Sequence, residues 1–207
     1  MPGTETCPGV TKPEILERIR PPANTVEDMA RAPRPQFAGA VYHITANGNR
    51  GSAIVLDDVD PRRFVAILGF VASSCGWQCH AVCVMTTHFH LLVTTPRANI
   101  AAGMHRLNGR YAQTFNERHG FAGHLFKARY HSVVVVDESH FFGTYRYIAQ
   151  NPVEAGACRS PADWRWSSYA ALVNGRTLLP GHCERILEHF GTGPAALRRL
   201  RRFVEGA

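Results

Sequence analysis

Hydrophobic residues along the chain follow two spacings, which predict an alternation of strands and helices. Runs of β-branched, aromatic and other apolar residues predict strands at 40–45, 78–85, 89–95 and 132–136. Apolar residues at helical spacing predict helices over 61–75, 99–118 and 138–150, and a terminal helical piece over 180–204. Gly76 and Gly120 are expected to end the first two helices, and Asn151-Pro152 the third.

The order of these elements indicates the fold class. It lacks the regular strand–helix–strand repetition of parallel sheets, so we expect an α+β fold with a mainly antiparallel sheet and flanking helices. Residues 1–36 are rich in proline and are expected to be disordered. A single domain large enough to carry a catalytic site is expected over 37–175, followed by a helical C-terminal extension over 176–207.

Composition narrows the class of protein. The 207 residues are 45% hydrophobic, which suffices for one packed core. The net charge of +7 favours a polyanionic partner, although charge alone is weak support. No stretch approaches 18 consecutive apolar residues and no signal peptide is visible, so we expect no membrane span and a cytoplasmic protein. The six cysteines are then expected to be free thiols.

Two histidines flank Phe89 at the start of the third predicted strand. Side chains alternate along a strand, so His88 and His90 point from the same face, roughly 7 Å apart, while Phe89 points from the other. Two imidazoles placed in this way can bind one divalent metal ion. A pair of hydrogen-bonded or solvent-facing histidines is the alternative, and it is the commoner origin of such a pattern when the pattern stands alone.

The helix predicted over 138–150 offers groups that could complete a site. Its apolar stripe includes Tyr145, whereas Tyr147 points almost the opposite way. Asn151 follows Tyr147 by one turn, so the two are neighbours. Facing the histidines, they would supply a phenol nucleophile and an amide ligand. A metal ion would polarise a phosphodiester for attack by the otherwise weak phenol. An ordinary surface tyrosine is the alternative.

Six blocks of sequence between Met29 and Gly175 carry a resemblance to a known family. The blocks are Tyr42-His-Ile-Thr-Ala-Asn-Gly-Asn, Met85-Thr-Thr-His-Phe-His-Leu-Leu-Val, Arg106-Leu-Asn-Gly-Arg-Tyr-Ala-Gln-Thr-Phe-Asn, Gly123-His-Leu-Phe-Lys-Ala-Arg-Tyr, Arg146-Tyr-Ile-Ala-Gln-Asn-Pro-Val-Glu-Ala-Gly and Asp163-Trp-Arg-Trp-Ser-Ser-Tyr. In these blocks the chain resembles the single-tyrosine (HUH) transposases of the insertion sequence 200-like family, and among them the REP-associated tyrosine transposases. It departs from the usual pattern in Thr86-Thr87, commonly Pro-Asn, and in lacking a histidine between Tyr147 and Asn151.

The resemblance implies a fold, a reaction and a set of roles. It implies a ferredoxin-like antiparallel sheet, with His88, His90 and Asn151 as ligands of Mg²⁺ or Mn²⁺ and Tyr147 as the nucleophile. Family members cleave and rejoin single-stranded DNA, commonly beside a hairpin, through a 5′-phosphotyrosine intermediate. Members of this subgroup often start with a Met-Ala-Arg-like sequence, which Met29 matches, so an upstream extension over 1–28 is left open.

Basic side chains between 97 and 131 are candidate DNA contacts. We expect phosphate contacts from Arg106, Arg110, Lys127 and Arg129, with nearby aromatic side chains available for stacking. A solvated helix face is the alternative, and both interpretations also stay open for the basic run 198–202. The expected partner is single-stranded or hairpin DNA, bound by a monomer or a homodimer.

Two rival functions use the same residues. One is a domesticated regulator that binds hairpin DNA without turnover. The other is a metal phosphodiesterase that uses water in place of tyrosine. The intact set of His88, His90, Tyr147 and Asn151 favours the strand-transferring enzyme over the regulator.

Overall fold

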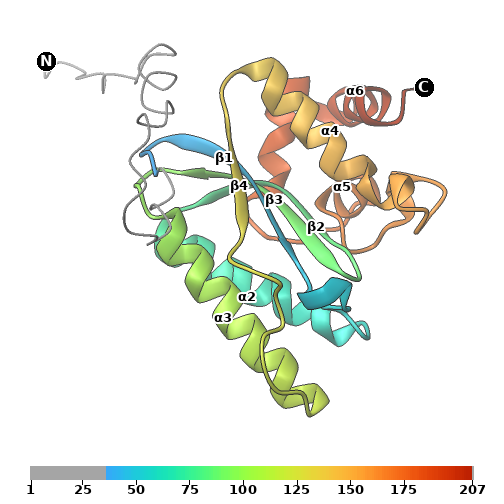
Figure 1. The fold of residues 1–207 in the computed structure, drawn as a ribbon. Coiled ribbons are helices and arrows are strands. Elements are labelled where there is room, and N and C mark those ends of the chain that lie inside the picture. The colour runs from blue at the N-terminus through green and yellow to red at the C-terminus, as the bar shows by residue number, and fades with distance from the viewer. Residues whose placement is uncertain (1–35, 207) are drawn as a thin grey trace, which may run out of the picture. The chain divides into compact units, whose positions relative to one another are not determined.

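A four-stranded antiparallel sheet forms the centre of the computed structural model, which describes residues 36–206 (Figure 1). The segment expected to be disordered lies outside the described residues except for Gln36. In the sheet, the strand order is β2-β3-β1-β4. The strands are β1 (Ala40–Asn47), β2 (Gln78–Val84), β3 (His88–Thr95) and β4 (His131–Val135). This arrangement confirms the predicted α+β, ferredoxin-like class.

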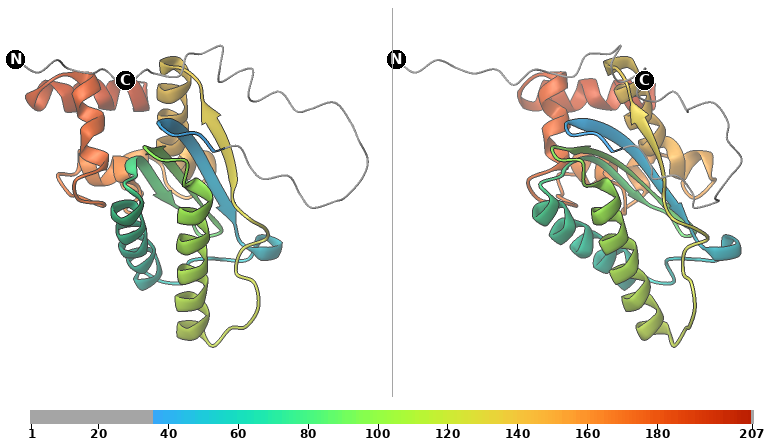
Figure 2. Two further views of the ribbon diagram at one scale, coloured as in Figure 1. Left: turned by 90° about the vertical axis from the view of Figure 1, so that its left-hand side faces the viewer. Right: turned by 60° about the vertical axis from the view of Figure 1, so that its left-hand side comes forward.

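Helices cover both faces of the sheet (Figure 2). Helices α2 (Val59–Cys75) and α3 (Ile100–His119) pack on one face, and α4 (Glu138–Glu154) packs on the other. Alternation along β3 separates the two cores, because Phe89, Leu91 and Val93 face α2 and α3 whereas Leu92 faces α4. The histidines flanking Phe89 therefore open toward α4.

The C-terminal residues pack beside α4. Short helices η2 (Pro161–Asp163) and α5 (Ser168–Val173) are followed by η3 (Cys183–Phe190) and α6 (Gly193–Glu205). In α6 the apolar positions Ala196, Leu200 and Val204 recur every four residues and are buried, and Leu200 and Val204 belong to the same core as Tyr145. The division of 37–207 at residue 175 stays a prediction. A short helix η1 (Asn49–Gly51) follows β1.

The predicted end of α4 was wrong. Pro152 lies inside the helix, which continues to Glu154. A proline in the last turn removes one backbone donor, and the turn is closed beyond it by the Ala155 amide, which donates to the Asn151 carbonyl at 2.9 Å. Asp137 caps the start of the helix by accepting from the His140 amide at 2.8 Å. Asn151 is thus held in regular helix, one turn after Tyr147.

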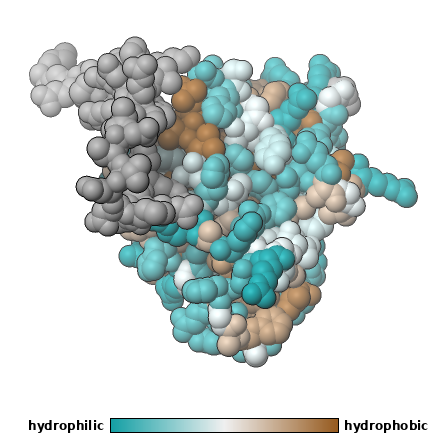
Figure 3. Space-filling model, viewed as in Figure 1, coloured by the Kyte–Doolittle hydropathy of each residue, from teal (hydrophilic) through white to brown (hydrophobic). Residues whose placement is uncertain are grey.

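Two predictions about the whole chain can be compared with the described part. The five described cysteines are free, as expected. Among the described residues, no helix is long and apolar enough to cross a membrane. On the face shown in Figure 3, hydrophilic side chains predominate outside the grey segment.

Acid is expected to destabilise the fold through His80 on β2. Burial, with smaller effects of His189, Arg185 and His182, lowers the pKa of His80 from 6.5 to about 4. Between these values the unfolded chain binds a proton that the folded chain does not. Stability therefore falls as the pH drops below 6.5, by at most about 1.4 kcal/mol per pH unit, and is unaffected by this group above 6.5.

Urea unfolding between pH 7 and pH 4 measures this dependence. The His80→Gln protein should lose less stability on acidification than the parent, whereas a matched substitution of the exposed His105 on α3 should lose as much. An equal slope for the parent and the His80→Gln protein would contradict the assignment.

Candidate functional site

Three elements bring polar side chains together on the α4 face of the sheet. His88 and His90 project from β3 with ring centroids 5.0 Å apart. Asn151 projects from α4, and its Oδ1 lies 3.2 Å from His88 Nε2. His90 and Asn151 are buried, with 4% and 8% of their surfaces exposed. Residues 63 positions apart in sequence thus meet in one small polar centre.

Hydrogen bonds orient both imidazole rings through the same nitrogen. His88 Nδ1 lies 3.1 Å from the Thr87 hydroxyl, and His90 Nδ1 lies 3.1 Å from His43 Nε2. In both rings Nε2 is left free of these bonds, and that of His88 faces Asn151 on α4. Within the described residues, His90 Nε2 is buried without any hydrogen-bond partner. Such an orphaned nitrogen is costly unless a further ligand satisfies it.

The atoms at this centre fit a divalent cation. Two neighbouring ligands of an octahedral ion, each bound at about 2.1 Å, lie roughly 3 Å apart. His88 Nε2 and Asn151 Oδ1 have this separation, and the unpartnered His90 Nε2 offers a third atom. No group of three His, Cys, Asp or Glu side chains suited to a metal occurs in the described part of the chain. A cation at this centre would therefore take the amide oxygen as its third protein ligand.

Burial favours the neutral form of the histidines of the centre, which is the form that binds metal ions. Burial lowers the pKa of His90 to about 3, with smaller effects of His88 and His43. Burial also lowers the pKa of His43 to about 4, and it lowers the pKa of His88, which a hydrogen bond to the Asn151 amide oxygen opposes. Near pH 7 all three rings have a free lone pair on one nitrogen.

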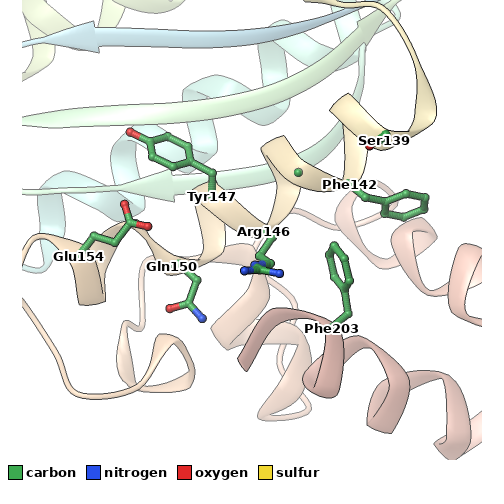
Figure 4. Close-up of a pocket in the computed structure, with 8 residues that line it drawn as sticks. Ser139, Phe142, Arg146, Tyr147, Gln150, Glu154 and Phe203 are labelled. Carbon is green, nitrogen blue, oxygen red and sulfur yellow. The ribbon is translucent and has the colours of Figure 1, made fainter. Parts of the chain in front are cut away.

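Tyr147 lies at the open edge of this centre. Its ring meets those of His90 and His43 edge-on, with centroid distances of 5.5 and 5.8 Å. Its hydroxyl lies 3.5 Å from Asn151 Nδ2, and 42% of the residue is exposed. In Figure 4 the ring extends away from Arg146 and Gln150. Tyr145, two residues earlier, is buried in the core, as predicted.

His43 also belongs to this centre, although its place in the sequence predicted no role for it. It pairs with Leu92 across β1 and β3, so His90 is its diagonal neighbour on the same face. The stacked rings have centroids 5.4 Å apart. Alternation along β1 puts His43 on the other face of the strand from the buried Tyr42 and Ile44. This alternation was the only signal in the sequence that His43 shares a face with His90. The register that brings it to His90 is not visible in the sequence.

The basic residues predicted to bind DNA divide into two places. Arg106 and Arg110 lie on α3 and contact α2, where Arg106 donates to the Ser74 hydroxyl at 3.0 Å and Arg110 lies over the Phe70 ring. This is the face of the sheet opposite Tyr147. Lys127 and Arg129 are exposed in the segment before β4.

The segment that carries Lys127 joins the sheet near the candidate centre. The Lys127 amide donates to the Asn47 carbonyl, and Asn47 pairs with His88. The structure therefore brings Lys127 to the histidine end of β3. It does not bring Arg106 or Arg110 there.

Comparisons with known proteins indicate the family and the fold of this chain. A family model described as Transposase IS200 like matches residues 37–151, more than half of the chain. The solved structure of a REP-associated tyrosine transposase bound to a REP hairpin matches with a TM-score of 0.58 and 19% identity, over 75% of this chain and 93% of that one. A transposase structure from Deinococcus radiodurans R1 has a TM-score of 0.39 and 22% identity, over 61% and 97%. No curated protein matches. The first structural likeness supports the fold.

Proposed function

The chain belongs to the IS200-like transposase family, and on this premise we propose that it cleaves and rejoins single-stranded DNA through Tyr147. The observation that carries the proposal is the position of the Tyr147 hydroxyl, which is 3.5 Å from the Asn151 amide and beside the His88–His90 pair. A nucleophile and a set of phosphate-activating groups thus occur together at an exposed edge.

The proposed reaction transfers a phosphoryl linkage from DNA to the protein. The Tyr147 oxygen attacks a phosphodiester phosphorus, and the bond from phosphorus to the 3′ oxygen breaks. The phenol proton is lost to a base, the departing oxygen takes up a proton, and a free 3′-hydroxyl remains. The 5′-phosphotyrosine keeps the energy of the broken bond, so attack by a 3′-hydroxyl rejoins a strand without another source of energy.

His88, His90 and Asn151 would hold a divalent cation such as Mg²⁺ or Mn²⁺. The orphaned His90 Nε2 and the 3.2 Å separation of the other two donor atoms support this assignment. When bound, the ion would polarise the phosphodiester and stabilise charge that develops on its oxygens. Thr87 and His43 would hold the two rings with Nε2 toward the ion, as hydrogen-bond partners of metal-ligating histidines do.

Single-stranded or hairpin DNA is the proposed partner. The net charge of +7 favours a polyanion, and the exposed Lys127 and Arg129 lie in a segment that joins the sheet beside His88. Contacts from Arg106 and Arg110 would require DNA to reach the α3 side as well. REP-associated hairpins are the first substrates to test, because the hairpin-bound transposase shares this fold.

Trapping the covalent intermediate tests the proposal. The protein is incubated with Mn²⁺ and single strands that carry a hairpin and a label at the 3′ end. A labelled adduct that survives denaturing electrophoresis is expected, and peptide mass spectrometry should place the nucleotide on Tyr147. Tight binding with no adduct would favour the regulator without turnover. Cleavage with no adduct would favour the phosphodiesterase that uses water.

Loss of the His43 side chain is expected to weaken metal binding about tenfold or more, because groups that orient a metal ligand contribute about this much to affinity. If His90 Nε2 is the ligand atom, Nδ1 carries the proton and donates it to His43 Nε2. His43→Gln keeps an acceptor and should bind Mn²⁺ more tightly than His43→Leu. Calorimetric titration with Mn²⁺ checks this order, and equal affinities for the parent and His43→Leu would contradict it.

A further inference from the structure

A cavity of about 600 Å³ lies beside Tyr147, between α4 and α6 (Figure 4). The α4 residues that line it are Ser139, Phe142, Gly143, Arg146, Tyr147, Gln150 and Glu154, and Phe203 lines it from α6. The volume lies within the range of small-ligand sites, roughly 300–1,000 Å³. None of the DNA contacts expected from the sequence is in this cavity, so its occupant requires a separate argument.

Arg146 gives the cavity an exposed positive charge. No ion pair or hydrogen bond holds its guanidinium within the described residues, whereas Arg118 and Arg165 are both paired with aspartates. Glu154 is the acidic residue of the lining, and it lies two turns beyond Arg146 along α4. A free guanidinium at the middle of the cavity suits a phosphate, which it can contact through two N–H groups at once.

Two aromatic rings form the apolar wall. Phe142 and Phe203 meet edge-to-face with centroids 5.8 Å apart, and both are half-buried. Gln150 donates to the Val204 carbonyl at 2.6 Å, which fixes its amide and leaves its oxygen free to accept a hydrogen bond. An aromatic wall with a fixed polar group beside it is suited to an unpaired base, because bases stack on such rings with little regard to sequence.

The presence of Tyr147 in the lining indicates which molecule the cavity binds. Tyr147 lines the cavity and, under the proposed function on which this inference rests, is bonded to a DNA phosphate during the reaction. The nucleotide next to that phosphate is thereby tethered to a residue of the same lining that carries Arg146 and Phe142. We propose that this cavity binds one unpaired nucleotide next to the scissile phosphate, with its phosphate on Arg146 and its base against Phe142 and Phe203.

Binding of a fluorescein-labelled oligothymidylate tests the phosphate contact. The titrations use the full chain with a chelator, so that no cleavage chemistry is involved, at several salt concentrations. Each phosphate contact with a single strand adds about 0.7 to the slope of log K against log salt. Arg146→Ala should therefore lower this slope by about 0.7. The ratio of the affinity at 0.1 M salt to the affinity at 1 M salt should then be about fivefold smaller than in the parent. Arg62→Ala, an exposed arginine on α2, is the matched control and should change neither quantity.

Crosslinking tests the base contact. Strands that carry 5-iododeoxyuridine are irradiated with the parent protein, and the joined peptides are identified by mass spectrometry. A crosslink to Phe142 or Phe203 is expected. Crosslinks that lie only outside α4 and α6 would overturn the inference. The inference would also be overturned if the Arg146→Ala protein had the same salt slope as the parent. An equal loss of slope and affinity in the Arg62→Ala protein would overturn it as well.

These outcomes are independent of the covalent chemistry. If the protein forms the Tyr147 adduct but binds oligothymidylate equally with and without the Arg146 side chain, the nucleotide cavity is refuted and the proposed function stands. A protein that shows the expected salt effect and crosslink but forms no adduct would lose the proposed reaction, and the cavity would remain as a binding site for single strands.

Discussion

Replacement of Tyr147 by phenylalanine is expected to abolish the covalent adduct and strand cleavage while DNA binding remains close to that of the parent. The substitution removes one oxygen atom, which is the atom that would bond to phosphorus. Removing a nucleophile lowers turnover by at least roughly 10³-fold. The affinity should survive because phosphate contacts, which dominate binding, do not involve the hydroxyl. Gel analysis of cleavage and anisotropy measurements of binding check the two parts of this result.

Tyr145→Phe is the matched control, because the two tyrosines lie two residues apart on α4. Tyr145 is buried in the core between α4 and the sheet, where burial raises the pKa of its hydroxyl. Its loss should leave cleavage nearly unchanged. A Tyr145→Phe protein of normal thermal stability that no longer cleaves DNA would show that the wrong tyrosine was chosen. Full cleavage by Tyr147→Phe would favour attack by water.

His88→Ala is expected to lower the cleavage rate by roughly 10²–10⁴-fold, because a bound cation contributes several kcal/mol of charge stabilisation in phosphoryl transfer. The fold should tolerate the change, since His88 is partly exposed whereas His90 is fully enclosed. Binding of the hairpin strand in the absence of metal should stay within about threefold of the parent, because phosphate contacts made elsewhere dominate affinity.

Cleavage rates across a Mn²⁺ titration measure the effect, and His105→Ala on the outer surface of α3 serves as the control. Excess Mn²⁺ should restore part of the lost activity if Asn151 and His90 still offer two donor atoms. A folded His88→Ala protein that cleaves at the parental rate would refute the ligand assignment. Loss of DNA binding together with cleavage would point to a role for His88 in holding the strand.

Alternation along β3 made much of this centre predictable from the sequence. Because successive side chains face opposite ways, Phe89 and Leu91 had to be buried on one side and His88 and His90 to share the other. The same reasoning on α4 separated the buried Tyr145 from the exposed Tyr147 and placed Asn151 one turn on. These inferences need only the local geometry of a strand or a helix, and the structure agrees with each of them.

Relations between elements could not be predicted in this way. His43 reaches His90 only because of the register between β1 and β3, which depends on how the whole sheet packs. The cavity at Arg146 depends on where α6 lies against α4, and the apolar spacing of α6 says that one face is buried but not against what. The extension of α4 past Pro152 was missed for a different reason, because the backbone bond from the Ala155 amide to the Asn151 carbonyl, which continues the helix past the proline, is not visible in the sequence. The monomer or homodimer expected from the sequence stays a prediction.

The placement of Tyr147 and Asn151 on one helix links two parts of the proposed reaction mechanically. The distance between them is set by the turn of α4, whereas their distance from the histidines is set by how α4 docks on the sheet through Ile148 and Ala149. A displacement of the helix as a rigid body would carry the attacking oxygen and the amide ligand away together. One movement of α4 would then assemble or take apart the whole centre. A centre with the tyrosine in place and the amide absent, or the reverse, would not form by such a movement.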